Sequence, residues 1–137
     1  MKKRSPVSSI MSTNVHVANI TNTISELKEL CESNNIRHVP ITSGNKVIGM
    51  VSQSDIMRIS YVSNLDGGEV ETSVYDSLKV EQVMTRDVVS VNPNDPIRDV
   101  VDIFVEQNFH ALPVVNEEKI VGIVTTKDIM KFMKDQF

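Results

Sequence analysis

The 137-residue chain has one cysteine, no tryptophan, two tyrosines and four phenylalanines. A single cysteine cannot form an internal disulfide, which excludes a small exported fold held together by disulfide bonds. No apolar run approaches the roughly 18 residues that a membrane-spanning helix needs, and no apolar signal segment follows the basic residues 2–4. These absences predict a soluble, cytoplasmic protein with no membrane association.

The sequence also lacks the residue patterns that nucleic-acid binding, metal binding and catalysis need. The net charge of −4 disfavours non-specific binding to nucleic acid. His16, His38 and His110 show no metal-ligand spacing, and Cys31 lies on the apolar face of an expected helix. The chain contains no GxGxxG motif, no P-loop and no convergent acid–base group. We therefore expect no metal site, no required cofactor and no enzymatic activity.

What the chain does contain is one unit written twice. An offset of 73 residues aligns residues 11–58 with residues 84–131 without a gap, and twelve of the 48 pairs are identical. A fixed offset over this length indicates a duplicated structural unit. Between the copies, residues 65–78 are acidic, contain two glycines and lack periodicity, as a linker does. We therefore predict a first repeat at 6–64, a linker at 65–78 and a second repeat at 79–137.

Each copy predicts the order β-α-β-β-α, which is a mixed α/β (α+β) fold. The first helix has a capping-box pattern at Thr23 and Glu26, and its counterpart has Asp95 as the expected N-cap with Pro96 at the first helical position. The last helix of each copy should begin near Ser54 or Lys127. The expected strands are Val15–Ala18, Val39–Thr42 and Lys46–Val51, and then Val88–Val91, Ala111–Val115 and Ile120–Val124.

Three motifs carry a family resemblance: VMTRDVVSV at 83–91, FHALPVV at 109–115 and GIVTTKDIM at 122–130. Together with the repeat, they make the chain resemble the tandem cystathionine-beta-synthase (CBS) domain pair, or Bateman module. The resemblance implies two repeats related by a pseudo-two-fold axis and regulatory binding of adenine nucleotides in clefts between them. It also implies that two modules pair into a flat disc of four repeats, without catalytic machinery.

The phrase that recurs at the end of each copy allows two interpretations. Ser52-x-x-Asp55 and Thr125-x-x-Asp128 fit a helix start, with a hydroxyl N-cap and an acid near the positive end of the helix dipole. Asp is short for a reciprocal capping box, so it is instead expected to point outward as an acceptor for ribose hydroxyls. The residues alone leave both interpretations open. The resemblance implies both roles, because this Asp matches the ribose-binding position of the family.

Cations should stand close to these helix starts. Arg37 and His110 correspond under the offset, and each precedes an apolar-Pro-apolar strand. In similar Bateman modules this position contacts phosphate; Arg37 is always charged, whereas His110 must be protonated to match it. Lys127 could reach the same phosphate, with Ser54 in its place in the first copy, and His38 has a weaker claim. The candidate walls of an adenine slot are Val15, Val39, Val88 and Leu112, which also fit core packing.

The sequence thus predicts a regulatory module that binds an adenine nucleotide, with AMP favoured and ADP, ATP, NAD or S-adenosylmethionine as other candidates. We expect a homodimer, formed through the helices that carry Met57 and Met130, that signals to an effector protein the sequence does not identify. The alternative is a ligand-independent dimerisation scaffold with vestigial clefts. A nucleic-acid or cobalamin-related binder is disfavoured by the charge and by the missing histidine motifs.

Overall fold

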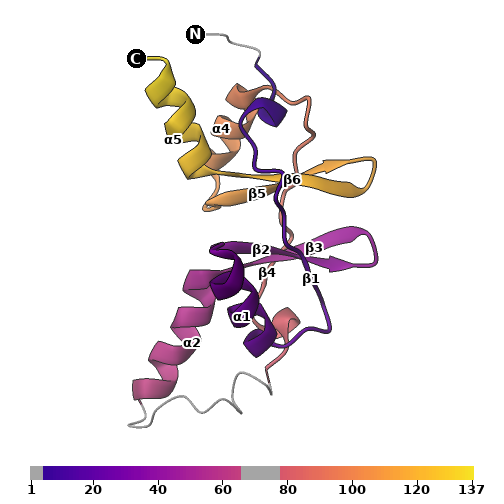
Figure 1. Cartoon of the computed structure of the whole chain (residues 1–137), viewed down its shortest axis with the longest axis vertical. Helices are drawn as coiled ribbons and strands as arrows, with labels where there is room; N and C mark the ends of the chain where they lie inside the picture. Colours follow the sequence, from indigo (N-terminus) through magenta and orange to yellow (C-terminus); the bar gives the residue numbers. More distant parts are fainter. Residues whose placement is uncertain (1–4, 66–77) are drawn as a thin grey trace. The chain divides into compact units, whose positions relative to one another are not determined.

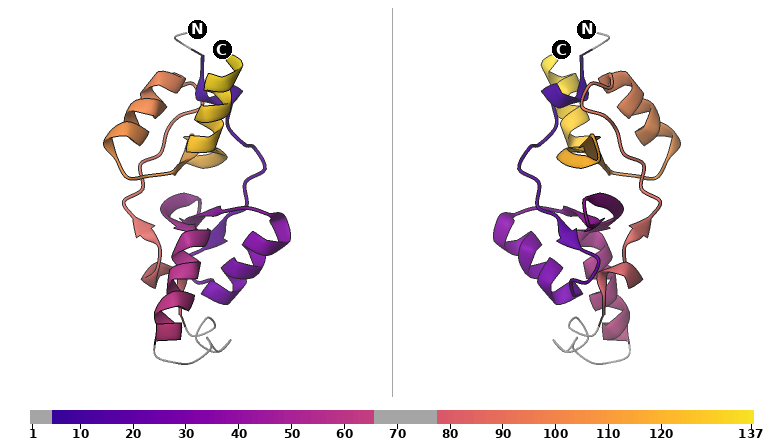
Figure 2. Two further views of the ribbon diagram at one scale, coloured as in Figure 1. Left: turned by 90° about the vertical axis from the view of Figure 1, so that its left-hand side faces the viewer. Right: turned by 90° about the vertical axis from the view of Figure 1, so that its right-hand side faces the viewer.

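The computed structural model describes residues 5–65 and 78–137, which form two compact units. We call residues 16–88 the first-repeat unit, and residues 1–15 together with 89–137 the second-repeat unit. Each unit has its own sheet, its own pair of helices and its own buried apolar cluster. In each unit both helices lie on the same side of the sheet (Figures 1 and 2).

The first-repeat unit contains a four-stranded sheet in the order β1-β2-β3-β4. β1 is parallel to β2, and the other neighbours are antiparallel. The turn between β2 and β3 has Gly44 at a φ of 63°, a left-handed conformation that glycine adopts without a steric penalty. The elements are β1 (Ala18–Asn19), α1 (Ile24–Asn34), β2 (His38–Ser43), β3 (Lys46–Ser52), α2 (Gln53–Leu65), the short 3-10 helix η2 (Val80–Gln82) and β4 (Thr85–Arg86).

The second-repeat unit repeats this plan with a smaller sheet. Its hairpin is antiparallel, and a single parallel bridge from Val91 to Val114 stands where the first-repeat unit has β1. Glu117 and Glu118 form the turn with φ values of 49° and 67°. The elements are the 3-10 helix η1 (Val7–Ser9), α4 (Ile97–Glu106), β5 (Ala111–Asn116), β6 (Lys119–Thr125) and α5 (Thr126–Asp135).

Each unit is completed by a segment that precedes the other repeat in sequence. Val7 is fully buried in the apolar cluster of the second-repeat unit, and Val80, its partner under the offset, is fully buried in that of the first. The first N–H of α4, from Ile97, donates to the Ser5 carbonyl at 2.9 Å. Ile24, at the start of α1, donates in the same way to Leu78 at 3.2 Å. The two incoming segments therefore exchange places between the repeats.

The exchange explains why both copies have a glycine at the same place, Gly49 in the first and Gly122 in the second. A Cβ atom on Gly122 would lie 2.6 Å from Met11 Sδ and 2.9 Å from the Ser12 carbonyl oxygen. A Cβ atom on Gly49 would meet Met84 Sδ and the Thr85 carbonyl oxygen. The incoming segment thus crosses the hairpin where the strand has no side chain.

Most expected elements are confirmed, and the four hairpin strands match to within one residue at their starts and ends. The first strand of each copy was predicted too long and too early. β1 covers only Ala18–Asn19 where Val15–Ala18 was expected, and its counterpart is the single bridge at Val91 where Val88–Val91 was expected. The predicted linker lies almost entirely outside the described residues. No helix in the described part of the chain combines the length and apolar character needed to cross a bilayer.

The expected N-cap of α4 was wrong. Pro96 occupies the N-cap position and no side chain caps the helix, which begins at Ile97. The Asp95 carboxylate turns back and accepts the Asn92 N–H at 2.9 Å. The physical reason is the exchanged segment, because the Ser5 carbonyl already accepts the Ile97 N–H and a side-chain cap is not required there. The predicted capping box of Thr23 and Glu26 is confirmed.

Candidate functional site

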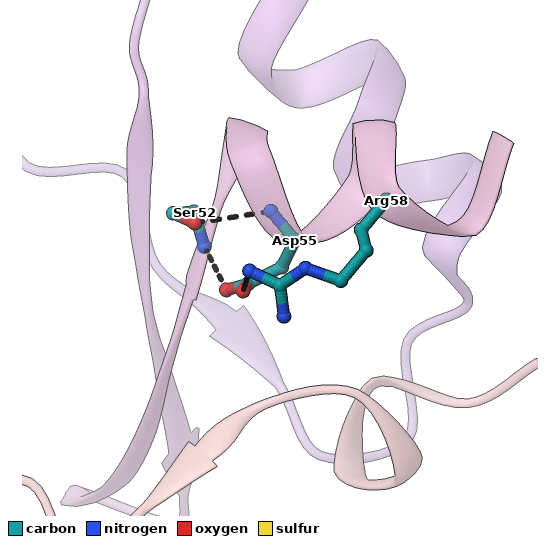
Figure 3. A network of polar contacts seen from close by, with 3 residues as sticks. All are labelled: Ser52, Asp55 and Arg58. Atoms are coloured by element: carbon teal, nitrogen blue, oxygen red, sulfur yellow. Dashed lines mark hydrogen bonds and ion pairs between the residues drawn. The ribbon is translucent and has the colours of Figure 1, made fainter. Parts of the chain in front are cut away.

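The start of α2 is a reciprocal capping box formed by Ser52 and Asp55. The Ser52 N–H donates to Asp55 Oδ2 at 2.8 Å, and the Asp55 N–H donates to Ser52 Oγ at 3.1 Å (Figure 3). The second oxygen of the carboxylate, Oδ1, faces Arg58 Nη2 at 3.6 Å. Asp55 is therefore both a helix cap and a fixed acceptor, with its side chain only 15% exposed.

The start of α5 has the same geometry. The Thr125 N–H donates to Asp128 Oδ2 at 2.9 Å, and the Asp128 N–H donates to Thr125 Oγ1 at 3.2 Å. The expectation that Asp is too short to reach back was wrong in both copies. Thr125 has an extended backbone with φ of −117° and ψ of 164°, and the short carboxylate still reaches its N–H across the first turn. One oxygen caps the helix, and the other is left for a further contact.

Arg37 and His110 are tied to these helix starts by the main chain. The Gln53 N–H donates to the Arg37 carbonyl at 2.8 Å, and the Thr126 N–H donates to the His110 carbonyl at 3.0 Å. Both side chains are exposed. The structure thus brings the main chain of the residue that carries the cation next to the helix start that carries the hydroxyl and the carboxylate. We call Arg37, Ser52 and Asp55 the first candidate site, and His110, Thr125 and Asp128 the second candidate site.

The remaining polar candidates lie at the same helix starts. Ser54 and Lys127 are exposed residues in the first turns of α2 and α5. His38 is half-buried and pairs with Ser52 in the β2–β3 register, whereas Ala111 occupies the matching place opposite Thr125. The second candidate site therefore has a lysine where the first has a serine.

The four apolar candidates divide into two pairs. Val39 and Leu112 have no exposed surface and belong to the apolar clusters of their units, so their side chains serve the core and offer no surface to a ligand. Val15 and Val88 are half-buried and lie where the chain passes from one unit to the other. Of the four, only this second pair keeps side-chain surface that a base could contact.

Arg58 is a neighbour of the site that the sequence reasoning missed. It lies one turn after Asp55 on α2, and its side chain is 71% exposed. The offset pairs it with Lys131, so both copies carry a cation three residues after the aspartate. That repeated spacing was the signal that could have found it. Within the described residues, no ion pair joins Lys131 to Asp128.

Cys31 is confirmed as a buried apolar residue. It is 3% exposed and packs in the core of the first-repeat unit. Burial, with a smaller effect from Glu32, raises the pKa of the Cys31 thiol above its ordinary value. Such a thiol is a poor nucleophile. The described part of the chain contains no group of three His, Cys, Asp or Glu side chains arranged to hold a metal ion.

Two β-α-β-β-α repeats, each ending in a hydroxyl-and-aspartate helix start beside a cation, define a tandem-repeat α+β protein. The family model of the CBS domain matches this chain twice, at residues 7–61 and 80–135. The chain belongs to the CBS domain family, as its motifs indicated.

Individual relatives agree with this assignment. Protein MJ1225 of Methanocaldococcus jannaschii is 30% identical over 129 residues, which cover 93% of this chain and 42% of that protein. A 17.7 kDa protein of Acidianus ambivalens is 31% identical over 131 residues, which cover 94% of this chain and 73% of that one. The CBS domain pair of protein MJ0100, solved in complex with 5′-methylthioadenosine and S-adenosyl-L-methionine, superposes with a TM-score of 0.78 at 25% identity, covering 97% of this chain and 98% of that one.

Proposed function

We propose that the chain is a regulatory module that binds an adenine nucleotide, with AMP favoured, and passes its occupancy to a partner protein. The observation that carries the proposal is the repeated placement of a carboxylate, a hydroxyl and a cation at the last helix of both units. Membership of the CBS domain family and the adenine-containing ligands of the MJ0100 domain pair support it. On this proposal the module is not an enzyme and acts in the cytoplasm, where its ligand is a metabolite.

Each group in a candidate site has a proposed role. The carboxylate oxygen that does not cap the helix, Oδ1 of Asp55 or Asp128, accepts the ribose hydroxyls. The hydroxyls of Ser52 and Thr125 stand at the positive end of a helix dipole, which favours a phosphate. The phosphate is also contacted by polar side chains around each helix start. In the first site these are the exposed Arg37 and Ser54 and the half-buried His38, and in the second they are the exposed His110 and Lys127.

Phosphate chemistry is the reason to favour AMP over an uncharged adenosine derivative. Arg37 is a permanent cation whose planar guanidinium can form paired hydrogen bonds to phosphate oxygens. Lys127 adds a basic side chain on the other helix start. In each site the adenine ring is proposed to contact the half-buried valine of the same unit, which is Val88 in the first-repeat unit and Val15 in the second-repeat unit. ADP, ATP, NAD and S-adenosylmethionine are the competing ligands that experiment must rank.

We propose that the module acts as a homodimer formed through α2 and α5. Met57 is 64% exposed on α2, and Met130 and Met133 are 68% and 45% exposed on α5. Large apolar side chains exposed on a helix favour association, because burial in an interface removes them from water. Sedimentation of the protein as a monomer at high micromolar concentration would argue against this dimer.

The alternative function is a dimerisation scaffold that needs no ligand. The observation in its favour is the exposure of large apolar side chains on several helices: Met57 on α2, Met130 and Met133 on α5, and Val105 on α4 at 78% exposure. Such a surface can hold two copies together whether or not a nucleotide is bound. On this alternative the helix-start carboxylates are caps and nothing more.

A nucleotide panel separates the two functions. A ligand that binds only the folded chain raises its stability by about 2.7 kcal/mol at a concentration one hundred times the dissociation constant. For a chain of this size, that gain moves the melting temperature by several degrees. Thermal melting should be measured with AMP, ADP, ATP, NAD and S-adenosylmethionine. A shift that is largest with AMP supports the proposal, and no shift with any of them at millimolar concentration supports the scaffold.

A further inference from the structure

The carboxylate of Asp55 is contacted on both of its oxygens. Oδ2 accepts the Ser52 N–H at 2.8 Å, and Oδ1 lies 3.6 Å from Arg58 Nη2 (Figure 3). The side chain of Asp55 is 15% exposed, whereas that of Arg58 is 71% exposed. The carboxylate is thus held in place, while the guanidinium can leave it for another anion.

Asp128 offers a matched comparison inside the same molecule. Its Oδ2 accepts the Thr125 N–H at 2.9 Å, as in the first site. Lys131 occupies the place of Arg58, yet the described residues include no ion pair from it to Asp128. A compact ammonium is more strongly hydrated than a guanidinium and lacks its planar fork, so it holds a carboxylate less well. The two candidate sites therefore differ at the oxygen that is left for a ligand.

We propose that Arg58 is a specificity-determining residue of the first candidate site, which favours phosphorylated ribosides over uncharged ones. This inference rests on the proposed function and concerns the same site. A ribose hydroxyl that donates to Asp55 Oδ1 must share that oxygen with Arg58, which weakens both contacts. An uncharged riboside gives Arg58 nothing in return. A ligand with a phosphate offers the displaced guanidinium an anionic partner that can accept two hydrogen bonds from it.

The second site should not discriminate in this way. In the second site no cation from the described part of the chain is paired with Asp128, so a ribose hydroxyl that donates to Oδ1 does not have to share that oxygen. Adenosine should therefore bind the second site more tightly than the first. AMP should show a smaller difference between the two sites.

The test uses the full chain in two backgrounds. Asp128→Ala leaves the first site, and Asp55→Ala leaves the second. Dissociation constants for adenosine and AMP are measured by calorimetry in each background. Arg58→Gln in the first background should tighten adenosine binding about two- to fivefold, the range that an exposed ion pair supports, and should not tighten AMP. Lys131→Gln in the second background should leave adenosine binding unchanged.

Further measurements control for misfolding and separate the possible outcomes. The melting temperature of the ligand-free Arg58→Gln chain shows whether that variant is folded. If Arg58→Gln is not folded, Arg58→Lys, which keeps the charge, is used in its place. For Arg58→Lys we expect a smaller gain in adenosine affinity. An unchanged ratio of the adenosine and AMP constants in Arg58→Gln overturns this inference alone. A wild-type chain that binds neither ligand overturns the proposed function and this inference with it.

Discussion

The Thr126 N–H donates to the His110 carbonyl at 3.0 Å, which fixes the start of α5 to the residue ahead of β5. Gln53 and Arg37 repeat the contact at 2.8 Å. Because the main chain makes this contact, the side chains of Arg37 and His110 are not needed to hold the helix start. They are exposed and remain available for a ligand.

Substitution of either cation should therefore affect binding and not folding. We expect Arg37→Ala and His110→Ala each to reduce the melting shift produced by AMP, and to leave the melting temperature of the ligand-free protein within a degree or two of wild type. Added salt should reduce the wild-type shift as well, because it screens exposed charges. Ligand-free variants that melt far below wild type would contradict the assignment of these side chains to ligand contact.

Asp128 should matter more for binding than Asp55. Loss of a charged hydrogen bond to ribose costs about 1.5–3 kcal/mol, or roughly ten- to a hundredfold in affinity. We expect Asp128→Ala to show this loss and Asp55→Ala a smaller one, because Arg58 already occupies one Asp55 oxygen. Asp128→Asn keeps an acceptor for the helix cap and separates the cap from the charge. Equal losses in the two alanine variants, measured by calorimetry, would count against the asymmetry.

The exchanged segments make a prediction that can be located along the chain. Val7→Ala and Val80→Ala each remove buried methyl groups, at a cost of about 1.5–3 kcal/mol. Amide hydrogen exchange should quicken in α4, β5 and β6 for Val7→Ala, and in α1, β2 and β3 for Val80→Ala. Faster exchange in the repeat that carries the substitution in its own sequence would show that the segments do not exchange.

Gly49 and Gly122 should not tolerate a methyl group. A Cβ atom at either position meets a methionine sulfur and a main-chain carbonyl oxygen, and overpacking of this kind costs about 1–3 kcal/mol. Met84→Ala should recover part of the loss in Gly49→Ala, and Met11→Ala part of that in Gly122→Ala. Urea denaturation measures the free energy of unfolding of each variant. Gly44→Ala gives a comparison in which backbone strain acts alone, because Gly44 has a positive φ but open space around it.

Cys31 should make stability fall at alkaline pH. Burial raises the pKa of the folded-state thiol, so the unfolded chain ionises first as pH rises above about 8.5. The contribution is fully present below the unfolded-state pKa and is lost as pH rises through the folded-state pKa. The free energy of unfolding should therefore decrease more between pH 8 and 10 in wild type than in Cys31→Ala. Identical decreases would remove Cys31 as the cause.

The repeat made most of the fold predictable. The gapless offset and the strand patterns placed the four hairpin strands and the starts of the last helices to within one residue. It also paired Arg37 with His110 and Asp55 with Asp128, which the structure places at equivalent helix starts. Local patterns succeed here because turns, caps and strands are decided by neighbours in the chain.

The features that the sequence did not predict depend on contacts between distant segments. Comparison of two copies cannot say which core Val7 enters, because either core offers the same pattern. The uncapped start of α4 follows from that segment, since Ser5 satisfies the Ile97 N–H. The Arg58–Asp55 ion pair depends on side-chain rotamers, which the spacing permits and does not determine.

The exchange of segments also bears on how such a gene can change. A recombination event that removes one repeat at its sequence boundary would also remove a segment that the neighbouring repeat needs. The reason is that Val7 lies in the core of the second-repeat unit and Val80 in the core of the first-repeat unit. We therefore expect the two repeats to be duplicated, lost or fused to other proteins together during evolution. A lone repeat expressed by itself would have to borrow its missing segment from a second copy of the chain.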